Sequence, residues 1–149
     1  MANKTIVSEF VRNNLDTRSD PDAIPRMTRM LLVDKSITNI DVKDSDYGDN
    51  TALHHQALWG TTRSVAWLLQ QDPPPDGNIR DSIQSTPLIY AACADEDPEG
   101  KVRILLEHGA DRDRTTGIGN TALSLARSYN KNPAAVIDLL ENYRPDVSR

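Results

Sequence analysis

The sequence predicts an all-α fold, in which short helices pair and the pairs repeat along the chain. Three similar segments support this prediction, because their threonines Thr51, Thr86 and Thr121 are separated by 35 residues each time. A constant interval of this size is typical of repeat architectures. After each of these segments comes a second apolar segment that ends in a leucine pair, at positions 68–69, 105–106 and 139–140. We therefore expect two helices in every unit.

The middle unit contains Thr86-Pro87-Leu88, Ala91-Ala92, Ile104-Leu105-Leu106 and Glu107-His108-Gly109-Ala110-Asp111. In this order the residues resemble the ankyrin-repeat family, whose unit reads roughly Gly-x-Thr-Pro-Leu-His-x-Ala-Ala and ends in Gly-Ala-Asp. The resemblance covers about residues 40 to 143, although Ala52 replaces the proline of one unit and Ser124 the histidine of another. It implies an ankyrin-repeat α-solenoid of about four helix-turn-helix repeats with β-hairpin-like fingers. A finger is the extended loop before the inner helix of a repeat.

Residues 4–38 are expected to form a degenerate first repeat. Ile6 and Phe10 belong to one helical apolar pattern, and Ile24 and Leu31 belong to a second. This pair lacks the Thr-Pro-Leu-His motif, as an end repeat with one polar face would. The remaining units are expected at 39–71, 72–108 and 109–143, with a tail at 144–149, in one domain over 1–149.

Helix ends can be assigned from capping residues. Thr51 is expected to cap the inner helix of its unit, and the outer helix is expected from Thr62 to Gln70. In the next unit, Asp97 is expected to cap the outer helix and Pro98 to begin it. The acidic run at 95–99 is therefore interpreted mainly as a solvated capping turn, with attraction of a basic partner as the alternative.

Charge and cysteine usage restrict the class of function. The formal net charge of −5 argues against nucleic acid, which needs clustered lysine and arginine. Cys93 is the single cysteine, so an internal disulfide is excluded and a reducing compartment fits. The start of the chain lacks a signal-peptide core, and no stretch approaches the ~20 apolar residues that span a bilayer. We expect a soluble cytoplasmic or nuclear protein that does not bind membranes.

Two features suggest a metal site. An EF-hand loop in the acidic stretch would need a ligand at position 48 and a glutamate at position 55, where the chain has Gly48 and His55. A solvated turn is therefore favoured. His54 and His55 suggest zinc, but no cysteine or second histidine pair completes a site, and the family resemblance implies a structural role for His54. We expect no metal and no cofactor.

A small enzyme is the alternative to a binding protein. In that case Asp95 would act with His55 or His108 as an acid–base pair. The chain has no nucleophile elbow, phosphate-binding loop or His-Glu-x-x-His motif. Cys93 has no base near it in the sequence, so it is expected to be a small, half-buried side chain. We therefore expect that the protein is not an enzyme.

A stack of such repeats would leave finger tips and the ends of inner helices exposed on its concave side. The residues predicted there to contact a partner are Tyr47, Asn50, Leu58, Trp59, Ser82, Ile83, Ser85, Ile118, Asn120 and Tyr129. Trp59 is expected to be the main anchor, because tryptophan and tyrosine dominate interface energetics. The sequence thus predicts a protein–protein interaction module, monomeric when unbound. The family resemblance implies an adaptor or a stoichiometric inhibitor in signalling.

Overall fold

The structure, a computed structural model, describes residues 39–43 and 48–145. The helices in this part of the chain are α3 (Ala52–Trp59), α4 (Thr62–Leu69), α5 (Pro87–Ala92), α6 (Pro98–Glu107), α7 (Ala122–Tyr129) and α8 (Ala134–Asn142). Over these residues there is no strand, and the fold is all-α as predicted. The degenerate repeat expected at 4–38 lies outside the described residues.

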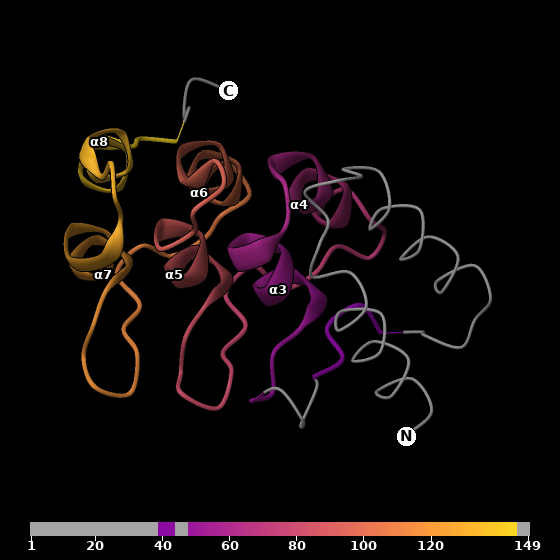
Figure 1. Cartoon of the computed structure of the whole chain (residues 1–149). Coiled ribbons are helices and arrows are strands. Elements are labelled where there is room, and N and C mark those ends of the chain that lie inside the picture. Colours follow the sequence, from indigo (N-terminus) through magenta and orange to yellow (C-terminus); the bar gives the residue numbers. More distant parts are fainter. Residues whose placement is uncertain (1–38, 44–47, 146–149) are drawn as a thin grey trace.

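The helices lie in two layers (Figure 1). The first layer holds α3, α5 and α7, which we call the inner helices, and the second holds α4, α6 and α8, the outer helices. Each inner helix packs against the outer helix that follows it, and neighbours within each layer also touch. The loops before α5 and α7 extend to the same side of the inner layer (Figure 1). We call these two segments, residues 78–85 and 111–120, the finger loops.

Side-chain caps begin the three inner helices and the outer helix α6. Thr51, Thr86 and Thr121 each accept a hydrogen bond from a backbone N–H in the first turn of α3, α5 and α7, respectively. Asp97 caps α6 in the same way, and Pro98 is the first helical residue. Each cap satisfies a backbone donor that has no partner inside the helix. The capping predictions for Thr51 and Asp97 are confirmed.

The core lies between the two layers. It contains alanines of the inner helices, including Ala57, Ala91 and Ala126, whose small side chains let neighbouring helices approach closely. The three predicted leucine pairs of the outer helices are buried as well, at 68–69, 105–106 and 139–140. Burial of such side chains is the main stabilising term available to these short helices.

Polar contacts also join successive helix pairs. The Thr62 hydroxyl donates to the Asp97 carboxylate at 2.6 Å, across an interval of 35 residues. The buried Lys101 ammonium donates to the carbonyl of Gly60, 2.9 Å away, at the end of α3. Asn130 donates to the Ala92 carbonyl at 3.0 Å. The bonds from Lys101 and Asn130 satisfy carbonyl groups at the ends of α3 and α5, where helices leave acceptors without internal partners.

Candidate functional site

A groove of about 620 Å³ lies on the face formed by the inner helices and the two finger loops. Its lining consists of Leu58, Ile83, Ser85, Ile89, Tyr90, Cys93, Thr116, Gly117, Ile118, Asn120, Leu125 and Tyr129. These residues come from three successive helix pairs, so the groove exists only when the pairs pack side by side. None of the described residues that line it is charged.

Large apolar side chains at the groove are exposed to solvent. Ile118 is 88% exposed, Tyr129 is 72% exposed and Ile83 is 59% exposed. Isolated exposed apolar residues are normal on a protein surface, but these three border one continuous apolar depression. Contiguous apolar surface of this kind marks sites of interaction.

The first finger loop is held by Asp81, which is buried. Its carboxylate accepts hydrogen bonds from the N–H groups of Ile83 at 3.0 Å and Ser85 at 2.9 Å, and from the Tyr90 hydroxyl at 2.6 Å. Burial, followed by the bond to Asp81, raises the pKa of the Tyr90 hydroxyl well above its usual value. Tyr90 therefore remains neutral and continues to donate this bond at physiological pH. The network orients Ile83 at the rim of the groove.

The second finger loop is a hairpin closed by its own backbone. An isolated bridge pairs Thr115 with Thr121, and the Thr116 N–H donates to the Asn120 carbonyl at 2.9 Å. Gly119 has φ +86°, a conformation that glycine adopts at little cost, and this allows the sharp reversal after Ile118. The reversal places Ile118 at the tip of the loop.

Six of the ten residues predicted to contact a partner line this groove: Leu58, Ile83, Ser85, Ile118, Asn120 and Tyr129. Asn50, Ser82 and Trp59 are not in the lining, although Trp59 is 44% exposed at the end of α3. Tyr47 lies outside the described residues. Trp59 as the main anchor stays a prediction, since the groove itself uses its neighbour Leu58.

The prediction that Ser85 is an exposed finger residue is wrong. Ser85 is only 2% exposed. Its N–H donates to Asp81, and its carbonyl accepts a bond of 3.0 Å from His54 Nε2. Both backbone groups thus anchor the base of the finger loop, which draws the residue into the protein.

Six lining residues were not among the ten predicted to contact a partner: Ile89, Tyr90, Cys93, Thr116, Gly117 and Leu125. A signal for two of them existed, because Tyr90 and Leu125 each come four residues after the capping threonine of their helix. In α3 the corresponding position is His55, which is buried. Aligning the helices on their capping threonines shows that this position is apolar or aromatic in two of them. That comparison would have added Tyr90 and Leu125 to the candidate site.

The two adjacent histidines serve packing and hydrogen bonding. His54 Nδ1 accepts from the Thr51 N–H at 3.1 Å, and Nε2 donates to Ser85, which confirms the structural role expected for His54. Burial lowers the pKa of His55 to about 4, with a smaller contribution from His54. Among the described side chains, no group of three or more His, Cys, Asp or Glu residues lies close enough together to hold a metal ion.

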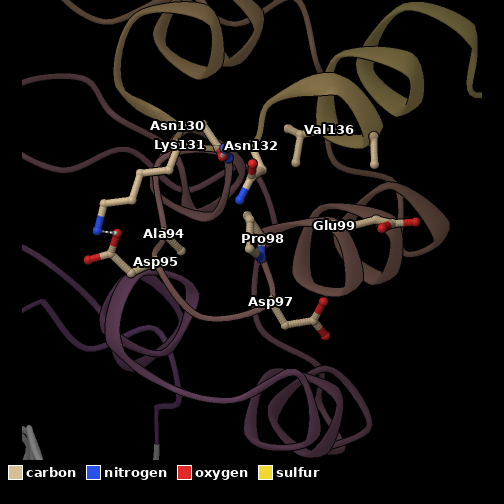
Figure 2. A pocket seen from close by; sticks show the side chains of 10 residues that line it. Ala94, Asp95, Asp97, Pro98, Glu99, Asn130, Lys131, Asn132 and Val136 are labelled. Carbon is tan, nitrogen blue, oxygen red and sulfur yellow. Dashed lines mark hydrogen bonds and ion pairs between the residues drawn. The ribbon is translucent and has the colours of Figure 1, made fainter.

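A second, smaller pocket of about 290 Å³ separates the loop after α5 from the loop after α7 (Figure 2). Its acidic residues already have partners. Asp95 pairs with Lys131 at 3.4 Å, as the dashed line in Figure 2 shows, and Asp97 caps α6. Glu99 pairs with Arg103 at 3.2 Å. The acidic run thus forms capping and surface contacts.

The residues of the alternative acid–base pair make other contacts. Asp95 is engaged with Lys131, and His108 Nδ1 donates to the Ile104 carbonyl at 2.9 Å in its own helix. Cys93 is half-buried in the groove wall, as expected, and burial raises the pKa of its thiol. A raised pKa disfavours the nucleophilic thiolate.

None of the helices in the described part of the chain has the length and apolar character that crossing a membrane requires. Comparison of the sequence with models of known protein families gave no match, and comparison with curated proteins gave none.

Proposed function

We propose that the chain is an ankyrin-type α-solenoid that binds another protein through the groove between its finger loops and inner helices. In this role it would act as an adaptor or as a stoichiometric inhibitor. The proposal is carried by the exposed apolar side chains Ile83, Ile118 and Tyr129, which lie around one groove whose described lining residues are uncharged.

Hydrogen bonds at equal register support the repeat architecture. The Ser82 N–H donates to the Gly48 carbonyl at 2.9 Å, and 35 residues further on the Gly117 N–H donates to the Ile83 carbonyl at 3.0 Å. The same contact is thus made twice between successive loops. Together with the repeated threonine caps and leucine pairs, this regularity is what an array of similar units would produce.

The energetics of association support the binding role. Burying an exposed isoleucine or tyrosine against a partner removes apolar surface from water, at roughly 25 cal/mol per Å². The tyrosine also offers a hydroxyl that can bond at the edge of an interface. The finger loops and inner helices are held by hydrogen bonds before any partner arrives. Binding to a preformed surface avoids much of the ordering cost.

The test is a comparison of captured proteins. Wild-type chain and the variant Ile118→Asp are immobilised, exposed to the same cell extract, and compared by quantitative mass spectrometry. The aspartate places a charge at the rim of the apolar groove, and its desolvation should oppose binding. We expect at least one protein to be captured by the wild type and lost from the variant. Its affinity is then measured with purified components.

Ala134→Asp is the matched control. It adds the same charge at an exposed position that begins α8, away from the residues that line the groove. An acidic residue is tolerated in the first turn of a helix. A captured protein that is retained by Ala134→Asp and lost from Ile118→Asp supports the proposal. If every captured protein binds both variants as well as the wild type, the groove is not the binding site.

A further inference from the structure

The described residues that line the groove offer a ligand no charge with which to pair. Several charged side chains that flank the lining residues in the sequence have partners within the chain. Asp95 pairs with Lys131, Arg114 with Asp111, and Arg127 with Glu141, and the buried Asp81 carboxylate is hydrogen-bonded by Tyr90. A charged side chain entering the groove would lose hydration without gaining an ion pair, which is unfavourable. The occupant should therefore be uncharged where it touches the groove.

The finger loops are poorly suited to pair with an extended strand. Addition of a strand to a protein depends on main-chain hydrogen bonds along an open sheet edge. The described residues form no strand. Backbone groups of the loops are engaged with each other: Gly117 donates to Ile83, and Ser82 donates to Gly48. Within the first loop, the Asp81 N–H donates to the Ser85 carbonyl at 3.1 Å.

A partner helix does not depend on main-chain hydrogen bonds to a sheet edge, because its own backbone hydrogen bonds are satisfied internally. It presents apolar side chains at i, i+3 or i+4, and i+7 along one face, which is the recurring way in which a groove binds a helix. The groove volume of about 620 Å³ is large enough for several side chains. Its lining includes the buried Ile89, the half-buried Leu58 and Leu125, and the exposed Ile83 and Ile118.

We infer that the groove binds the apolar stripe of a helix that belongs to the partner protein, with uncharged side chains at the contact. This inference rests on the proposed function and adds the chemistry of the partner. Because no ion pair forms across the contact, salt should hardly change the affinity.

The test uses the full chain and synthetic helical peptides of about 18 residues, long enough to form helix when Ala-rich. One peptide has leucines at helical spacing on one face and Glu and Lys on the other. A second has the same composition in scrambled order, a third has a lysine in the middle of the stripe, and a fourth alternates Val and Thr to favour strand. A fifth peptide is proline-rich.

Binding is measured by fluorescence anisotropy at about 50 mM and about 500 mM NaCl, which span strong and weak screening. Cys93 supplies an independent measure of where the peptide binds, since it is the single cysteine of the chain and lines the groove. Its rate of reaction with an uncharged maleimide should fall when the groove is occupied.

We expect the striped peptide to bind and to slow labelling of Cys93, with less than about a twofold change in Kd between the two salt concentrations. The scrambled, lysine-containing and strand-forming peptides should bind at least tenfold more weakly. Ile118→Asp should weaken binding of the striped peptide at least tenfold, whereas Ala134→Asp should leave the affinity for this peptide unchanged.

Several results would overturn the inference. Failure of the striped peptide to bind, or its binding without protection of Cys93, would exclude a helix in the groove. Tighter binding of the strand-forming or proline-rich peptide would show that an extended segment is the ligand. Sedimentation that shows self-association abolished by Ile118→Asp would identify a second copy of the chain as the occupant.

These results are distinguishable from failure of the proposed function. A captured partner that depends on Ile118, combined with a striped peptide that does not bind, refutes only the helix. If every captured protein is insensitive to Ile118→Asp, protein binding by the groove itself is refuted.

Discussion

The groove face and the outer helices of this protein share one core but present opposite chemistry to solvent. Outer helices α4, α6 and α8 expose charged residues, among them Arg63, Glu107 and Asp138. On the groove face, the exposed side chains include Ile83, Ile118 and Tyr129, and the described lining residues carry no charge. Packing of the core explains the buried side of both layers. It does not explain why apolar residues stay exposed on one face, and this difference is the basis of the proposed binding surface.

Leu105→Ala should produce the largest effect, because Leu105 is buried between the layers. Removal of a buried leucine leaves a cavity and costs roughly 2–5 kcal/mol of unfolding free energy. Ile118→Ala is the matched comparison: its side chain is almost fully exposed, so the cost should be within about 0.5 kcal/mol. Urea denaturation monitored by circular dichroism measures both. Equal losses in the two variants would contradict the division between core and exposed groove rim.

Acid should destabilise the protein through the buried inner-helix histidines. His55 has a pKa of about 4 in the folded chain, and burial also lowers the pKa of His54. The unfolded chain therefore binds protons at a higher pH than the folded one does. The stability associated with His55 should be complete above about pH 6.5 and should fall by up to about 3 kcal/mol as the pH decreases to about 4.

The measurement is the free energy of unfolding at several pH values for wild type and His55→Gln. Glutamine cannot titrate, so the variant should lose stability less steeply between about pH 6.5 and pH 4. Carboxylates titrate in both chains and cancel in the comparison. Identical pH profiles would show that His55 is not responsible.

Two variants compare a residue that lines the groove with one that lies outside the lining, by their effects on partner affinity. Tyr129→Ala should weaken the binding of a captured partner by roughly 2 kcal/mol, because Tyr129 lines the groove and is exposed. Trp59→Ala should have the smaller effect if the groove alone is the contact surface, since Trp59 is outside the lining. Isothermal titration calorimetry gives both affinities, and circular dichroism checks folding. A larger loss for Trp59→Ala would extend the contact surface beyond the groove and support the prediction made from the sequence.

Of all these treatments, addition of a metal chelator should change the protein least. The stability described above comes from apolar packing and capping bonds, so treatment with a chelator should leave the helical circular dichroism unchanged. A loss of helical signal that zinc restores would show that metal binding is coupled to folding and would reopen the role of His54 and His55.

Much of the helix pattern could be predicted from local features of the sequence. The outer helix expected at Thr62 to Gln70 is observed at Thr62–Leu69, and the caps Thr51 and Asp97 and the buried leucine pairs are found where expected. These features depend on neighbours only a few residues away, through capping and helical periodicity. Residues 4–38 and Tyr47 lie outside the described residues, so the expectations for them stay predictions.

The groove could be predicted only in part. Exposed positions such as Ile118 and Tyr129 follow from register, but Ser85 was wrongly expected to be exposed, and Tyr90 was missed. The positions of Ser85 and Tyr90 both depend on Asp81. Its carboxylate accepts hydrogen bonds from the Ser85 N–H and from the Tyr90 hydroxyl. Such a network requires groups from a loop and a helix to meet, and spacing alone does not specify that meeting.

The sequence by itself determined the all-α class, the caps Thr51 and Asp97, and the apolar side chains that had no evident place in the core. The tertiary structure decided which of those side chains border one groove and which, like Trp59, lie beside it. The physical reason is that helix propensity, capping and periodicity act within one or two turns of the chain. A groove is a property of three helix pairs in contact, and its shape depends on distances between residues far apart in the sequence.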